Sequence, residues 1–402
     1  MRSDGTLSDT SSRCDSRAIS GDTLTRCKQL LSAVPTTLTS LNKGLNTLQF
    51  QSLSVNPANV KNVMGGTQDN GTFQTTGSSV VWPQIIFGDG GQSGFDATNP
   101  DFRVHTYTGT SPEVNFNDGN PANWIYTGDP IFEAGQFYSP LITDPNVHGT
   151  MYMGANHVWR TKTNGVGPDV ATANAHCNEL YGDFDPSYTC GDWVALDGAS
   201  LTSSTRGDRA GGNISAIART SADNSTLWAA TDNGRVFITK NADAEPASSV
   251  SFTRLDSLAT NDPNRFVSGI YANPANANQA WISYSGFSAC GCAGIQSDNP
   301  GHVFKVTYDP VAGTATWDDL SYNLDSGGND LPITGLVRDD NTGDLYASSD
   351  FGVLRLASGD TSWNLAATGM PNIEVAGLTI VPSKRKLFAA SHGQGAWSLT
   401  LP

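Results

Sequence analysis

The chain repeats one pattern of hydrophobic and polar positions seven times. Each unit begins with an apolar segment that in several units ends at Asp-Pro or Asn-Pro. A segment of small residues, a turn of Gly, Asp or Asn, and a third apolar segment follow. Most units then have a fourth segment, often with a Trp. Short alternating segments between turn residues predict β-strands, so we expect each unit to form a small antiparallel sheet.

The units begin near residues 51, 93, 140, 215, 268, 334 and 376, at intervals of roughly 40 to 75 residues. Repeats of this kind are typical of β-propellers with loop insertions. The last unit has only three strands, whereas residues 36–48 resemble an unpartnered strand. We therefore predict an all-β fold, a single seven-bladed β-propeller over 35–402 that is closed by an N-terminal strand completing the last blade. Residues 1–34 are expected to form an N-terminal extension with a short disulfide-tied helix.

Composition agrees with this fold and excludes some functions. The 402 residues include 42 Gly and 20 Pro, which suits many tight turns. The net charge of −15 argues against a nucleic-acid partner, because phosphates are bound by clustered Lys and Arg. No segment approaches the ~20 apolar residues that would span a bilayer. Because Met1 is followed directly by polar residues, we expect an export signal or further domains of the same precursor upstream.

The six cysteines form three close pairs: Cys14 with Cys27, Cys177 with Cys190, and Cys290 with Cys292. Local pairs are typical of disulfides in secreted proteins. Zinc ligation is the alternative, although the chain has no CxxC motif. We predict disulfides and an extracellular location; the Cys290–Cys292 ring is the most strained of the three.

Several segments carry a resemblance to a known superfamily. GGTQDNGT, LYASSDFGVLRL, LFAASHGQGAWSL and the turn SGDTSW (358–363), with partial matches at RTKTNG and ITKNAD, resemble the Asp-box (BNR-repeat) propellers. That superfamily includes sialidases, xyloglucanase-type glycoside hydrolases and sortilin-like receptors. The resemblance covers about residues 40–402. It implies the propeller fold and a secreted, bacterial, carbohydrate-active protein.

Candidate catalytic residues come from the loops of one face. In a propeller blade, the turn between the second and third strands and the link to the next blade reach the same face. Asp69 and Asp89 lie in such loops of the first unit, and Asp232 and Asp350 in those of later units. Glycoside hydrolysis needs two converging carboxylates, one as acid and one as base or nucleophile. The alternative is that these aspartates only shape tight turns.

Further polar and aromatic residues of the same face are candidates for substrate binding. Arginines would clamp an anionic group, and aromatic rings would stack on sugars or belong to the core. Histidines could ligate a metal, but no HxH or HExxH spacing supports one. The substrate-binding candidates are Gln68, Asn70, His157, Arg206, Arg209, Tyr284, His302, Phe351 and His392. We expect no cofactor beyond a structural Ca²⁺ held by Asp and Asn oxygens.

Two functions fit these observations. The first is a glycoside hydrolase or lyase that acts on a polysaccharide through the loop aspartates. The alternative is a non-catalytic glycan- or protein-binding propeller module of a larger secreted protein.

Overall fold

The computed structural model describes residues 2–39, 47–183, 185–288, 299–326 and 328–402. The chain divides into two compact units, Met1–Thr47 and Leu48–Pro402. The predicted boundary fell earlier, after residue 34. Within the described part, none of the helices is long and apolar enough to cross a membrane.

The N-terminal unit is small. It contains the 3₁₀ turn η1 (Ser11–Cys14), helix α1 (Gly21–Leu31) and two short strand pairs. The first pair is β1 (Arg2–Ser3) with β4 (Leu38–Thr39), and the second is β2 (Leu7–Ser8) with β3 (Val34–Pro35). The predicted disulfide between Cys14 and Cys27 joins η1 to α1, with 6.0 Å between the Cα atoms. Helix α1 has no buried residue, so this disulfide and a hydrogen bond of 2.8 Å from the Thr10 amide to Leu31 O tie the helix to the rest of the unit.

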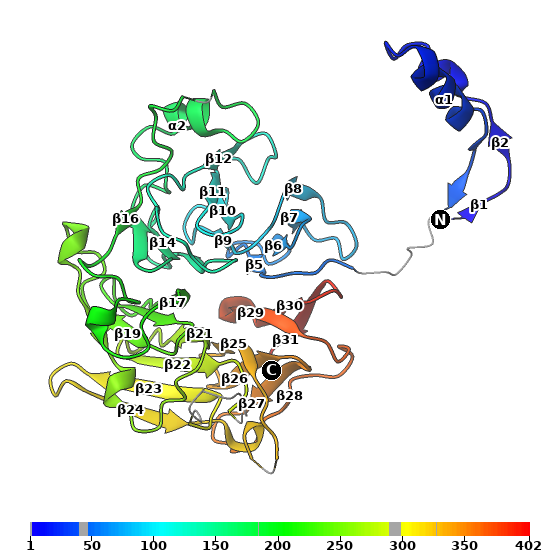
Figure 1. Ribbon diagram of the computed structural model, residues 1–402. Helices are drawn as coiled ribbons and strands as arrows, with labels where there is room; N and C mark the ends of the chain where they lie inside the picture. Colours follow the sequence, from blue (N-terminus) through cyan, green and yellow to red (C-terminus); the bar gives the residue numbers. More distant parts are fainter. Residues whose placement is uncertain (1, 40–46, 184, 289–298, 327) are drawn as a thin grey trace. The chain divides into compact units, whose positions relative to one another are not determined.

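The second unit is a seven-bladed β-propeller, as predicted (Figure 1). Seven antiparallel sheets follow one another along the chain. Blade 1 contains β5 (Ser54–Val55), β6 (Val63–Thr67), β7 (Gly71–Thr75) and β8 (Gln84–Ile86). Blade 2 contains β9 (Ser93–Phe95), β10 (Arg103–Thr106), β11 (Pro112–Asn115) and β12 (Trp124–Tyr126). Blade 3 contains β13 (Leu141–Thr143), β14 (Met151–Gly154), β15 (Val158–Thr161) and β16 (Val194–Ala195).

The other four blades repeat this order. Blade 4 contains β17 (Ile214–Arg219), β18 (Leu227–Thr231), β19 (Val236–Thr239) and β20 (Phe252–Arg254). Blade 5 contains β21 (Val267–Ala272), β22 (Gln279–Tyr284), β23 (Val303–Asp309) and β24 (Thr314–Asp319). Blade 6 contains β25 (Ile333–Arg338), β26 (Leu345–Ser349), β27 (Gly352–Leu356) and β28 (Asn364–Leu365). Blade 7 contains β29 (Val375–Val381), β30 (Lys386–Ser391) and β31 (Ala396–Thr400).

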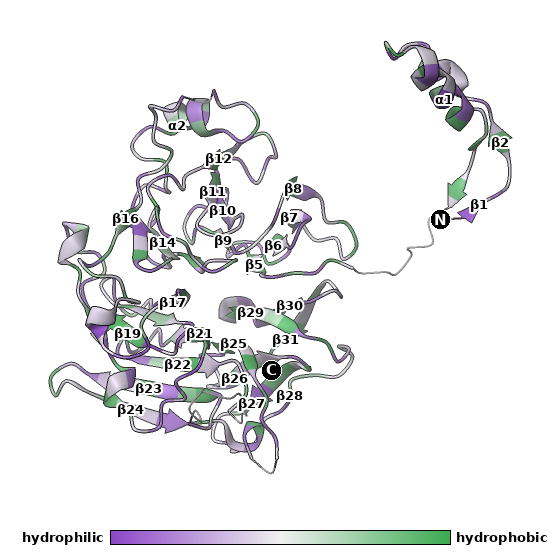
Figure 2. Ribbon diagram, in the orientation of Figure 1, coloured by the Kyte–Doolittle hydropathy of each residue, from purple (hydrophilic) through white to green (hydrophobic). Residues whose placement is uncertain are grey.

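The core lies between neighbouring sheets. Figure 2 shows hydrophobic residues in the strands of successive blades, for example in β19 and β29. One cluster joins Trp228 of blade 4 to Phe304 and Trp317 of blade 5, all of them buried. Trp124, Trp193 and Trp363 lie on or beside fourth strands of other blades and are also buried. Burial of such large rings between blades supplies much of the hydrophobic stabilisation.

Closure by an N-terminal strand is not seen. Blade 7 has three strands in the described part of the chain. Leu38–Thr39, in the segment expected to supply its fourth strand, pairs with β1 instead; residues 40–46 lie outside the described residues. Phe50 and Leu48 bond instead to the end of β30 and to the turn after it: the Phe50 amide donates to Ser391 O at 3.2 Å, and the Gly395 amide donates to Leu48 O at 3.0 Å. The first and last blades therefore meet through this turn and through the apolar contacts of Phe50 and Phe388.

A long insertion separates the third and fourth strands of blade 3. It contains α2 (Val170–Cys177) and the second predicted disulfide, Cys177–Cys190, whose Cα atoms are 5.8 Å apart. Cys290 and Cys292, the third predicted pair, lie outside the described residues. In a regular blade, the turn between the third and fourth strands lies at the face opposite the loop aspartates. The insertion folds back along the edge of blade 2, where Asn178 forms a bridge with Ile125 of β12.

Candidate functional site

One end of the propeller gathers almost all of the predicted site residues. Each blade is a simple antiparallel sheet, so the turns between second and third strands and the links between blades lie at the same end. We call this end the linker face. Its described segments are 68–70, 87–92, 107–111, 127–140, 155–157, 196–213, 232–235, 255–266, 285–288, 299–302, 320–326, 328–332, 350–351, 366–374 and 392–395.

Asp69 and Asp89 lie close together, and their role as a catalytic pair stays a prediction. The backbone amide of Asp69 donates to Asp89 Oδ1 at 3.1 Å, and the hydroxyl of Tyr138 donates to the same oxygen at 2.9 Å. Asp89 is buried, whereas Asp69 is exposed in a left-handed turn conformation with φ of 59°. Burial and the neighbouring Asp89 carboxylate raise the pKa of Tyr138. Asp89 thus fixes two loops of the linker face, and Asp69 faces solvent.

The link between blades 2 and 3 crosses this region. From residue 127 to 140 it contacts the turns of blades 2, 3 and 4. Gln136 donates to Asp232 Oδ2 at 2.7 Å, and the backbone amide of Asn213 donates to the same oxygen at 3.0 Å. Oδ1 of Asp232 is buried and has no hydrogen-bond partner in the described part of the chain. Asp232, like Asp89, therefore anchors this link.

Glu133 of the same link binds the turn of blade 3. Its Oε1 pairs with His157 Nδ1, and its Oε2 accepts bonds from the backbone amide of His157 at 2.9 Å and the indole of Trp159 at 3.1 Å. Burial disfavours the charged carboxylate, but these hydrogen bonds outweigh it and lower the pKa of Glu133 to about 2. The imidazole of His157, a predicted substrate-binding group, is thus paired with the carboxylate of Glu133.

The predicted arginine clamp is occupied by carboxylates of the protein. Arg206 pairs with Asp197 at 2.6 Å. Arg209 pairs with Asp256 at 2.5 Å and with Asp262 at 2.9 Å. Burial raises the pKa of Asp262 to about 6, against the opposing charge of Arg209. The Arg206 guanidinium thus holds the link between blades 3 and 4, and the Arg209 guanidinium holds the link between blades 4 and 5. An anionic ligand would have to displace buried carboxylates to reach Arg209.

Tyr284 and His302 lie beneath the surface. The Tyr284 hydroxyl donates to Asp262 Oδ1 at 3.1 Å, and its ring is fully buried, which favours the core interpretation over sugar stacking. His302 is also fully buried, with Nε2 2.8 Å from Asp330 Oδ1. Burial, reinforced by Arg265, lowers the pKa of His302.

His302 belongs to a group of potential metal ligands. One ligand atom each from His302, Asp325 and Asp330 lies within 4.8 Å of the others. However, Arg265 Nη2 lies 3.4 Å from His302 Nδ1, and a guanidinium this close opposes a second cation. Asp325 and Asp330 also accept bonds from Ser288, so they tie down the end of a loop. The expected structural Ca²⁺ stays a prediction.

The remaining candidates lie on other blades. Gln68 and Asn70 share the turn of Asp69, where the Asn70 amide donates to Gln68 O at 2.8 Å. His392 Nδ1 lies 3.2 Å from Glu374 in blade 7, and its Nε2 contacts Gln49. Asp350 and Phe351 form an exposed turn on blade 6.

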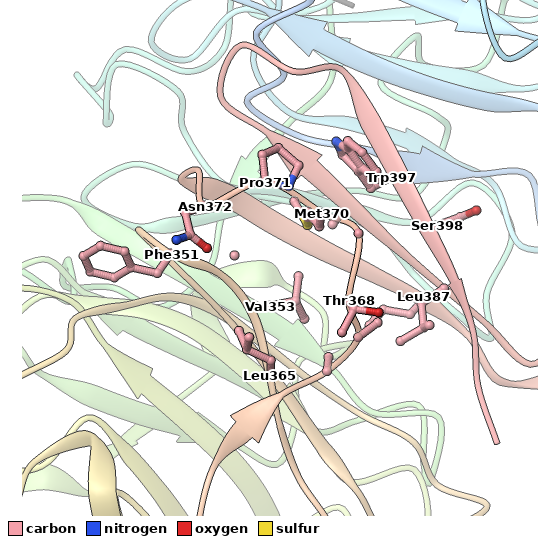
Figure 3. Close-up of a pocket in the computed structure, with 16 residues that line it drawn as sticks. Phe351, Val353, Leu365, Thr368, Met370, Pro371, Asn372, Leu387, Trp397 and Ser398 are labelled. Atoms are coloured by element: carbon pink, nitrogen blue, oxygen red, sulfur yellow. The ribbon is translucent and has the colours of Figure 1, made fainter.

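Phe351 lines an apolar pocket of about 460 Å³ between blades 6 and 7 (Figure 3). Leu365, Met370 and Trp397 are among its other lining residues. No charged side chain lines it in the described structure. The pocket borders β31, the outermost strand of blade 7 in the described part of the chain.

The central channel has no charged side chain among its described lining residues. Its cavity of about 280 Å³ is lined by first strands and adjoining residues of all seven blades. This described lining is uncharged, and small residues such as Ser52, Ser215, Ser268 and Thr334 alternate in it with Leu, Ile and Gln side chains. Chemistry that depends on carboxylates would therefore have to take place in the loops rather than in the channel.

Exposed aromatic rings gather on the linker face. Of the described residues, eight aromatic side chains are exposed, from 39% (Phe266) to 89% (Phe132), and seven of these belong to linker-face segments. They are Phe87, Tyr107, Phe132, Phe137, Phe266, Phe287 and Phe351. Phe132 is 89% exposed and Phe137 58% exposed, and both come from the link that carries Glu133 and Tyr138. The exposed aromatic rings of the described residues therefore lie mostly at this end of the propeller.

No protein-family model matches the chain, and no curated protein matches it in sequence. Its fold is similar to that of many solved propellers. The protein YCF48 from Cyanidioschyzon merolae superposes with a TM-score of 0.59 at 10% identity, over 89% of this chain and 97% of that one. The Cps50 (Swd1) β-propeller domain from Myceliophthora thermophila gives a TM-score of 0.57 at 10% identity, over 88% and 97%.

A GH74 xyloglucanase from Xanthomonas campestris is also similar, with a TM-score of 0.57 at 14% identity. The superposition covers 89% of this chain and 52% of the xyloglucanase, so the chain spans about half of that enzyme. At these identities the likeness shows the seven-bladed propeller fold. It does not distinguish a glycoside hydrolase from the other propellers.

Proposed function

We propose that this protein is a secreted glycan-binding propeller that holds polysaccharide on its linker face without cleaving it. The observation that carries this proposal is the gathering of seven exposed aromatic rings on that face. Aromatic faces stack on the apolar faces of sugar rings, and loop amides and carboxylates around them offer hydrogen bonds. The net charge of −15 suits a neutral or cationic glycan better than an anionic one.

Three further observations support binding over hydrolysis. Asp89 and Asp232 have their carboxylates engaged in holding loops. Asp350 belongs to blade 6, so blade 7 separates it in the ring from Asp69 and Asp89 of blade 1. The uncharged central channel offers no acid–base pair among the described residues. The xyloglucanase neighbour acts on a polysaccharide, as its name says, which agrees with a glycan ligand.

An extracellular setting is part of the same proposal. The disulfides Cys14–Cys27 and Cys177–Cys190 are of the kind that persists in oxidising compartments. Further domains of a longer precursor would then present the propeller to its glycan.

The test uses the purified chain and a panel of neutral plant, algal and microbial polysaccharides. Retardation in affinity electrophoresis measures binding, and an assay for new reducing ends measures cleavage. We expect retardation by at least one polysaccharide with no new reducing ends. New reducing ends that disappear in an Asp69→Asn/Asp89→Asn double variant would overturn the proposal in favour of a hydrolase.

A further inference from the structure

A pocket of about 290 Å³ lies between blades 1 and 2, beside the linker face. Blade 1 contributes Ile86 at the end of β8, and the link after it contributes Phe87 and Gly88. Blade 2 contributes Tyr107 and Ser111 from the turn after β10, Glu113 from β11 and Tyr126 from β12. The last lining residue, Glu179, comes from the insertion of blade 3.

The insertion is held against blade 2 by its backbone. The amide of Glu179 donates to Trp124 O at 2.9 Å, and the Asn178 side chain donates to Ala122 O at 3.0 Å. Asn178 also forms the bridge with Ile125. A carboxylate distant in sequence is thereby placed next to Glu113.

The two carboxylates differ in their partners. Glu113 is buried, and its Oε2 lies 2.7 Å from His105 Nε2, whose Nδ1 is 3.1 Å from the Thr72 hydroxyl. The Glu179 side chain has no hydrogen bond or ion pair to any described residue. Burial, together with the nearby Glu113, raises the pKa of Glu179 to about 7. The pocket thus holds a carboxylate without a cation to balance it.

The walls of the pocket are aromatic. Phe87, Tyr107 and Tyr126 line it, and no Lys, Arg or His is among its described lining residues. Aromatic faces attract cations, and a carboxylate forms a charge-assisted hydrogen bond with an ammonium group. The complementary ligand is therefore an ammonium group on a compact body that can pack against rings.

We propose that this pocket binds the protonated amine of an amino sugar within a polysaccharide. This inference rests on the proposed function, because it assumes that the ligand is a glycan. Phe87 and Tyr107 belong both to the pocket and to the exposed aromatic set of the linker face, so a chain held on that face reaches the pocket directly. A volume of about 290 Å³ equals about ten water volumes, which suits one sugar ring.

The experiment compares β-linked tetramers of glucosamine, N-acetylglucosamine and glucose, with tetralysine as a fourth ligand. Isothermal titration calorimetry on the full chain at neutral pH gives each affinity. We expect the glucosamine tetramer to bind about tenfold more tightly than the acetylated tetramer, because one charge-assisted hydrogen bond contributes a difference in affinity of about this size. Glu179→Gln should abolish this preference, whereas Asp360→Asn, which removes an exposed carboxylate in another blade, should retain it.

Phe87→Ala separates this inference from the proposed function. Its ring is 55% exposed, so the variant should fold, and it should weaken the binding of all three sugar tetramers. Equal affinity of the wild-type protein for the glucosamine and acetylated tetramers would overturn the amine pocket and leave glycan binding intact. Failure of every sugar tetramer to bind would overturn the proposed function itself. Preferential binding of tetralysine would overturn the assignment to a sugar.

Discussion

The hydroxyl of Tyr138 donates a hydrogen bond of 2.9 Å to the carboxylate of Asp89, although the two residues are 49 positions apart in the chain. This bond connects the link after blade 1 to the link after blade 2. It therefore sets the position of Phe137, which precedes Tyr138 and packs against its ring with centroids 4.8 Å apart.

Tyr138→Phe removes this bond and leaves the ring. We expect the free energy of unfolding to fall by about 1–2 kcal/mol, because the buried Asp89 loses one of its two donors. Urea denaturation measures the change. An unchanged free energy of unfolding would show that Asp89 finds another donor, such as water.

Removal of exposed rings should affect binding rather than stability. A Phe132→Ala/Phe137→Ala double variant is expected to bind the polysaccharide found in the panel about tenfold less tightly. Its melting temperature should change little, since both rings are largely exposed. Val311→Ala is the matched control: Val311 is 96% exposed but lies between β23 and β24, at the opposite end of the propeller. An equal loss of affinity in this control would show that the two rings have no specific role in polysaccharide binding.

Glu133 makes stability depend on pH in an acidic window. Its pKa falls from 4.5 to about 2 on folding, so the ionised carboxylate stabilises the fold above pH 4.5 and this contribution is lost as the pH falls towards about 2. Glu133→Gln should lower the free energy of unfolding by about 2 kcal/mol at about pH 7 and far less at about pH 2.5. Urea denaturation at both pH values measures the difference; a loss of equal size at both would contradict the role of the ionised carboxylate.

Arg209 is expected to be a structural residue. Arg209→Met leaves Asp262 buried without its cation, and we expect a loss of about 3 kcal/mol in the free energy of unfolding. Arg209→Lys should recover part of this loss, because one ammonium group reaches only one of the two carboxylates. If Arg209 were instead a ligand clamp, the Met variant would keep its stability and lose affinity for an anionic glycan.

The blades could be predicted from the sequence because they are local. Each blade consists of short strands that pair with their neighbours in the sequence, so the blades appear in the sequence as a repeat of alternating polar and apolar residues with turn glycines. Each predicted unit begins within a few residues of a first strand, such as β9 or β21. The predicted closing strand was not of this kind. It required a pairing between the two ends of the propeller, and Leu38–Thr39 pairs with β1.

The site could be predicted only in part, for the same reason. The proximity of Asp69 and Asp89 followed from the order of strands in one blade. Glu133, Gln136 and Tyr138 were missed, because the path of the link between blades 2 and 3 depends on contacts with three other loops. Glu179 was missed because its segment returns from blade 3 to the edge of blade 2. Neither this segment nor the edge of blade 2 has a hydrophobic periodicity that predicts their contact.

The three-stranded blade 7 has a consequence for how the ring opens. In the described structure, β31 is hydrogen-bonded on one side only, to β30. Its outward amide protons should therefore exchange with deuterium well before those of the third strands β15 and β19, which are enclosed between two neighbours. Local opening should start at this strand and spread inward through blade 7, so that blade 7 separates from the ring before the four-stranded blades do.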